Sequence, residues 1–170
     1  MRSDNPFWDY SLAVYGKPGV AEACIALQDE HGVDVNILLF VCWLATVRDA
    51  PVEVDEIRRA IDQTAEWHDH VVRPLRSVRR WLKEGVDGVP AESAESLRGG
   101  VKKVELESER LQQELLYALS VSTTDVRADA VSTRQRVEQN ISKYLNLLDI
   151  RDIAAVRDAC AVVIAAAHIP

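Results

Sequence analysis

The segment from residue 70 to residue 83 concentrates positive charge, with five Lys and Arg side chains and no acidic residue. A helical rotation of 100° per residue would place four of the five on one outer face. Guanidinium groups bind carboxylate or phosphate oxygens through paired hydrogen bonds. The segment therefore predicts a surface for an acidic protein partner or a phosphate-bearing ligand. Its candidate binding residues are Arg73, Arg76, Arg79, Arg80, Lys83 and the neighbouring Trp81.

The same basic segment also has a structural interpretation, in which it is a solvated helix face. Asp69 precedes Arg73 by four residues and Glu84 follows Arg80 by four, so both would form ion pairs along one helix. Such exposed pairs contribute only about 0.3–0.5 kcal/mol each. The other three cations of the segment have no acid one turn away on their own helix, which keeps the binding hypothesis open.

A second group of residues that could take part in chemistry, as metal ligands, precedes the basic segment. Glu66 and His70 are four residues apart, so on a helix they share a face and are candidate metal ligands. A di-iron bundle needs a repeated Glu-x-x-His pattern, but the residue three after Glu66 is Asp69. In the alternative interpretation His68 is a hydrogen-bonded core residue and His70 lies at the surface. A metal-binding helical bundle is therefore the weaker hypothesis.

The sequence contains no pattern typical of catalysis or cofactor binding. It has no nucleophile elbow, no glycine-rich dinucleotide fingerprint and no phosphate-binding loop of the Walker type. We therefore expect no cofactor and assign no catalytic residue, and a non-enzymatic role is favoured over an enzymatic one.

Length and composition exclude several protein classes. The chain has 170 residues, of which 48% are apolar, and carries a formal charge of −7. These values exclude collagen-like, disordered and disulfide-stapled proteins, and the acidic balance does not favour general nucleic-acid binding. Three cysteines, each in an apolar run and without metal-ligand spacing, predict a reduced, cytoplasmic protein. They are Cys24, Cys42 and Cys160.

The sequence predicts short helices in residues 1–50, the first of the elements that position these side chains. Asn5 followed by Pro6 is typical of a helix start, and Gly16 ends that helix. A second helix is expected from Val20 to about residue 30, because Gly32 is a good terminator.

Residues 35–47 form the most apolar stretch of the chain. Asp34 is well placed to cap a helix, but the stretch has no polar face, and periodicity alone does not separate a buried helix from a buried strand. We favour a helix, since about 14 residues is long for a strand. The stretch is shorter than the roughly 20 residues that a membrane span needs, and we expect no membrane span.

Two series of apolar residues at heptad spacing predict a long antiparallel helical hairpin. One series lies between residues 57 and 82 and the other between residues 97 and 118. Their members pair in reverse order, as two helices joined by a short loop require. We expect helices over about 55–84 and 93–120, with a kink at Pro74. The expected apolar contacts are Val78 with Val101 and Leu75 with Val104.

The C-terminal part, residues 125–168, predicts two more helices. Thr124 or Asp125 would cap the first, which runs to Leu148, and Asp149 would start the second. The chain is therefore expected to be all-α, a helical bundle of about six to seven helices in one domain over residues 1–170.

The first 50 residues resemble a known family of short uncharacterised proteobacterial proteins, a domain-of-unknown-function family. The resemblance continues through the Val72-Arg73-Pro74-Leu75-Arg76 segment and implies a small helical cytosolic protein without an assigned activity. The stretches that carry it are Phe7-Trp8-Asp9-Tyr10-Ser11, Tyr15, Gly19-Val20, Ala23-Cys24, Leu27-Gln28-Asp29, Gly32, Asp34-Val35-Asn36, Leu39-Phe40 and Trp43.

The first functional hypothesis is a helical interaction or adaptor module with a basic face on the hairpin. The alternative is a binding protein or enzyme for a small, partly apolar, anionic ligand, held in a pocket between the body helices and Arg73 and Arg76. A homo-oligomer is compatible with either hypothesis.

Overall fold

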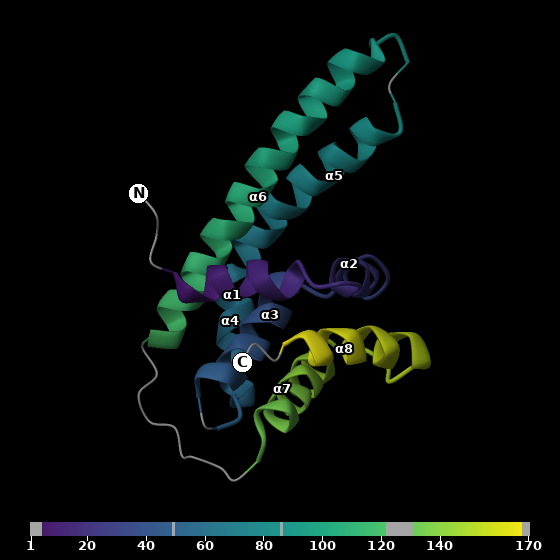
Figure 1. Cartoon of the computed structure of the whole chain (residues 1–170). Coiled ribbons are helices and arrows are strands. Elements are labelled where there is room, and N and C mark those ends of the chain that lie inside the picture. The colour runs from purple at the N-terminus through teal and green to yellow at the C-terminus, as the bar shows by residue number, and fades with distance from the viewer. Residues whose placement is uncertain (1–4, 49, 86, 122–130, 168–170) are drawn as a thin grey trace.

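The computed structural model describes residues 5–48, 50–85, 87–121 and 131–167 (Figure 1). Within these ranges every regular element is helical, so the predicted all-α class is confirmed. When α4, the π-helical turn η1 and α5 are counted as one continuous rod, the described residues form seven helical rods. This agrees with the predicted six to seven helices. The elements are α1 (Pro6–Tyr15), α2 (Val20–His31), α3 (Val35–Val47), α4 (Val54–Trp67), η1 (His68–Val72), α5 (Arg73–Lys83), α6 (Ala91–Val121), α7 (Thr133–Leu147) and α8 (Ala154–Ala166).

The first three helices begin and end at the predicted signals. The Asn5 side chain accepts hydrogen bonds from two N–H groups in the first turn of α1. Gly32 ends α2 with φ of 70°, a left-handed conformation that glycine adopts without strain. Asp34 accepts from the Asn36 N–H at 2.8 Å and starts α3, so residues 35–47 are a helix and not a strand.

The core is built around α3, which is buried on almost all sides. Its main neighbours in the fold are α1, α6 and α7, and α4 and α2 also contact it. Phe7 of α1 packs on Phe40 and Trp43 of α3 with ring centroids 5.4 Å apart in both pairs, and Tyr117 of α6 lies 5.8 Å from Trp43. A helix without a polar face is stable here because helices from three directions cover it.

The predicted hairpin is present and antiparallel. The rod of α4, η1 and α5 runs alongside α6, and its outer half projects away from the other helices (Figure 1). We call the projecting part, α5 with residues 91–109 of α6, the arm, and the remaining helices the body. α6 continues without a break through Gly99 and Gly100.

The disturbance expected at Pro74 takes the form of the π turn. Proline has no N–H, and its ring collides with the carbonyl four residues before it in a regular helix. The N–H of Arg73 donates instead to the carbonyl of His68, five residues back, which widens the turn. The widened turn begins where the arm leaves the body.

The C-terminal helices begin later in the chain than predicted. Thr124 and Asp125 lie outside the described residues, and α7 starts at Thr133, where Ser132 and Gln135 form a reciprocal capping box. α8 starts at Ala154 and not at Asp149, which has φ of 53° in the turn between the two helices. Among the described residues, no helix has both the length and the apolar character needed to cross a membrane.

Candidate functional site

The structure divides the predicted basic surface between two environments. Arg76 and Arg79 do not lie on an outer face of α5, because their side chains are directed at α6 and are largely buried there. The Arg73 and Lys83 residues are exposed. Trp81 is also exposed, with 58% of its surface accessible.

The two inward arginines meet two glutamates of α6. Arg76 Nε lies 3.2 Å from Glu105 Oε1, and its Nη2 lies 2.6 Å from Glu109 Oε1. Arg79 donates to both oxygens of Glu105, with 3.1 Å between Nη2 and Oε1. The Glu105 side chain is only 7% exposed, so this ion-pair cluster is part of the packing between α5 and α6.

Burial and the repulsion of nearby acids act on the pKa of Glu109. Burial raises the pKa of Glu109, and the negative charges of Glu105 and Asp34 raise it further against the opposing effect of Arg76. Hydrogen bonding to Glu105 raises the pKa of Arg79. The two arginines match the two glutamates in formal charge, and burial keeps the pKa of Glu109 raised despite its pairing with Arg76.

Two exposed cations of the predicted basic surface, Arg73 and Arg80, also have acidic partners. Arg73 pairs with Asp69 at 3.2 Å, as the spacing predicts. Arg80 pairs with Asp29 of α2 and not with Glu84 as expected. Three cations of the basic segment, Arg76, Arg79 and Arg80, are thus paired with acids that are distant in sequence, and Arg73 is paired with a local one.

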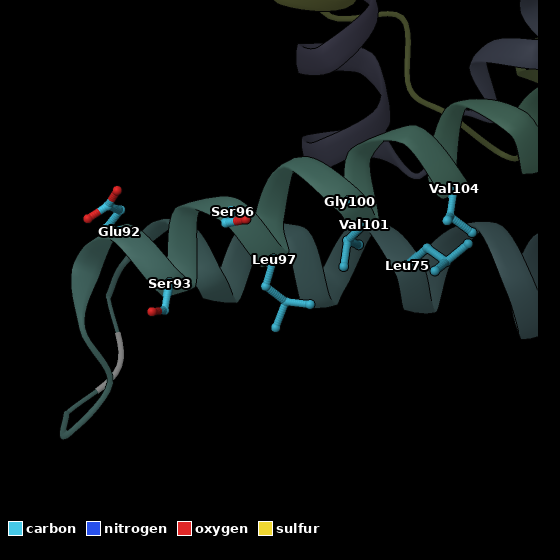
Figure 2. Close-up of a pocket in the computed structure, with 8 residues that line it drawn as sticks. All are labelled: Leu75, Glu92, Ser93, Ser96, Leu97, Gly100, Val101 and Val104. Atoms are coloured by element: carbon cyan, nitrogen blue, oxygen red, sulfur yellow. The ribbon is translucent and has the colours of Figure 1, made fainter.

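An apolar groove runs along the arm between α5 and α6. Its volume is about 780 Å³. Figure 2 shows Leu75 of α5 directed toward Val101 and Val104 of α6. Ser96 and Gly100, both exposed, line the same wall. The full lining is Leu75, Glu92, Ser93, Ser96, Leu97, Gly100, Val101 and Val104.

The prediction that both apolar series are buried between the two helices is wrong for α6. Leu97, Val104 and Leu115 of the series are 59%, 55% and 46% exposed. Ser108 is the member of the series that is buried as predicted, and Glu105, which does not belong to the series, is buried beside it. The ion-pair cluster occupies the interface and turns the apolar series of α6 outward. A signal for this was present, since Glu105 and Glu109 are one turn apart on α6, opposite the arginines of α5 in the antiparallel register.

The predicted metal ligands do not form a site in the described part of the chain. Glu66 and His70 are both exposed, and no group of three His, Cys, Asp or Glu residues there is arranged to hold a metal ion. His68 is largely buried, with Nε2 3.7 Å from Asp34 Oδ2 and Nδ1 3.5 Å from Asp69 Oδ1. Sequence reasoning did not link His68 to Asp34.

Comparison with known proteins gives one finding. A family model with the description "Protein of unknown function (DUF2390)" matches residues 6–116, which include the arm and its groove. No curated protein and no solved structure matches the chain.

Proposed function

Because the chain belongs to the DUF2390 family of proteins of unknown function, we propose its function from the geometry of the arm. The protein is a helical interaction module, and the groove between α5 and α6 binds an amphipathic helix of a partner protein. In this proposal it acts in the cytoplasm as one helical domain, without a cofactor or catalytic residues.

The exposed apolar surface of the groove is the observation that supports the proposal. Leu97 and Val104 are large, more than half exposed, and seven residues apart on one face of α6. Val78, one turn after Leu75 on α5, is 46% exposed. An exposed apolar surface that the described part of the chain leaves uncovered is typical of a protein interaction site.

The shape of the groove favours a helix as the occupant. Two antiparallel helices with apolar residues at heptad spacing present the surface that a third helix covers in a bundle. A side chain built at Gly100 would meet no atom within 4 Å, so a partner helix has room to approach there. Trp81 and Lys83, both exposed on α5, are available as additional contacts.

Site-specific photocrosslinking in cells of the protein's own host tests the proposal. A photoreactive phenylalanine at Leu97 or Val104 should crosslink one partner protein, which mass spectrometry identifies. The matched control is Leu106, which lies on the same helix, is 51% exposed and does not line the groove. Equal crosslinking at Leu106, or crosslinks only between two copies of this chain, would contradict the proposal.

Binding of the purified partner gives the quantitative test. Leu97→Glu and Val104→Glu should each weaken binding at least tenfold, because a carboxylate in an apolar interface loses its hydration without gaining a partner. Leu106→Glu should change the dissociation constant less than twofold. Far-UV circular dichroism should be unchanged in all three variants, since each position is exposed in the free protein.

A further inference from the structure

A second cavity lies in the body, where the arm begins. It is formed by the end of α2, the start of α3, the α4–η1 segment and α7, and has a volume of about 420 Å³. This volume is in the range of small-molecule sites. One part of its wall is apolar, formed by Val33, Ile37, Ile61, Ala65 and Leu148.

The carboxylate of Asp34 lines this cavity in a fixed orientation. One oxygen accepts from the Asn36 N–H at 2.8 Å, and the other accepts from Gln112 Nε2 at 2.6 Å. The Tyr144 hydroxyl accepts from the Asp34 N–H at 3.0 Å and donates to the Asp34 carbonyl at 3.3 Å. A carboxylate accepts about four hydrogen bonds, so Asp34 keeps acceptor capacity for a ligand.

The arginines in the cavity wall are engaged with other acids. Arg73 pairs with Asp69, and Arg76 is shared between Glu105 and Glu109. Asp29, a further lining residue, is paired with Arg80. The wall therefore contributes little free positive charge, and an anionic ligand, the type expected for a pocket beside Arg73 and Arg76, is disfavoured.

Asp34 itself is not compensated in the same way. In the ranges that the structure describes, no Lys or Arg side chain pairs with it. The His68 Nε2 atom is 3.7 Å from Asp34 Oδ2, which is beyond hydrogen-bond distance. His68 is also the first residue of the π turn, a type of distortion that is frequent at functional sites. The cavity thus combines an apolar wall with one carboxylate that is paired with no Lys or Arg of the described residues and faces only the imidazole of His68.

We propose that this cavity binds a small organic cation, a primary amine with a short apolar body. The ammonium group donates hydrogen bonds to Asp34, and the apolar body lies against the apolar wall. A charge-assisted hydrogen bond in a largely buried site supplies the orientation and selects amines over acids of the same shape. The proposal is independent of partner binding at the arm groove.

Nuclear magnetic resonance titration with two probes of equal shape and opposite charge tests the proposal. Benzylamine should shift resonances of His68 and Tyr144 saturably, with a dissociation constant in the millimolar range. Benzoate at the same concentration and ionic strength should leave them unchanged. Binding of benzoate alone, equal binding of both probes, or binding of neither up to 20 mM would overturn the proposal.

Two variants and a control locate the binding site. Asp34→Asn should weaken benzylamine binding at least tenfold. If this variant does not fold, Ala65→Leu decides, because it fills the apolar part of the cavity while preserving the carboxylate. Asp62→Asn removes an exposed carboxylate of α4 that does not line the cavity and should change affinity less than twofold. Unchanged affinity in Ala65→Leu would contradict the proposed site.

Discussion

At the scale of single residues, Glu105 is the acid on which the arm depends most. It accepts hydrogen bonds from both Arg76 and Arg79 while it is almost completely buried. Removing one partner of a buried ion pair is costly, because the remaining charges lose hydration without compensation. This cluster, and not a solvated face, is the environment of the two central arginines.

Glu105→Gln should lower the free energy of unfolding by about 3 kcal/mol, since it leaves Arg79 without a charged partner in the cluster. Urea denaturation followed by circular dichroism measures the change. Glu95→Gln is the matched control on the same helix, because Glu95 is exposed and pairs only with Arg98 of its own helix. It should leave the free energy of unfolding nearly unchanged, and an equal loss in both variants would contradict a structural role of the cluster.

The Glu109→Gln variant tests how the raised pKa of Glu109 affects the stability of the protein. The pKa of Glu109 is raised above its ordinary value of 4.5, so the folded state binds the proton more tightly than the unfolded chain. The contribution of this group to the free energy of unfolding therefore falls as pH rises from about 4.5 through the raised pKa. The variant should reduce this pH dependence and lose less stability at pH 7 than Glu105→Gln.

At the scale of elements, the ends of the helices follow local signals. Gly32 shows this most clearly, because it has φ of 70° and a Cβ there would meet no atom within 4 Å. A change in stability caused by a side chain at this position therefore comes from the backbone conformation and not from a steric clash. The helical Gly99 is equally free of neighbours and has no positive φ, which makes it a matched reference.

Gly32→Ala should lower the free energy of unfolding by about 1–2 kcal/mol, the cost of a left-handed conformation for an L-residue. Gly99→Ala should raise it by about 0.5–1 kcal/mol, because alanine loses less backbone entropy in a helix. Both changes are measurable by thermal or urea unfolding. The same sign for the two variants would contradict the assignment of these effects to backbone conformation.

At the scale of the whole molecule, burial is distributed unequally between body and arm. α3 buries ten of its thirteen residues, whereas α5 buries only Leu82. The stretch 91–101 of α6 buries only Ala94. The arm is thus held by ion pairs and a few apolar contacts, and the body by a continuous core.

Amide hydrogen exchange should detect this difference. Backbone N–H groups in residues 91–101 should exchange at least about 100-fold faster than those in 35–47, since local opening of the arm exposes little apolar surface. Mass spectrometry of peptides from the two stretches measures the rates. Equal protection would mean that arm and body unfold as one cooperative unit. A partner helix bound in the groove should slow exchange in residues 91–101 and leave 35–47 unchanged.

Local signals in the sequence determined most of the fold. Asn5, Gly32 and Asp34 fixed the boundaries of the first three helices, because capping and left-handed turns depend on residues within one turn. The heptad spacing predicted the hairpin and its antiparallel course. The capping box at Ser132 was also readable, but the preceding Thr and Asp residues offered an equally good local start.

The chemistry of the candidate sites was decided by tertiary structure. The sequence showed that Arg76 and Arg79 lack an acid on their own helix, but only packing brought Glu105 and Glu109 to them and turned the apolar series of α6 into an open groove. In the same way, Asp34 and His68 meet only after α3 and the π turn are placed side by side. Whether charged side chains of distant segments meet depends on which face each helix turns toward its neighbours. That orientation is set by the packing of the whole molecule.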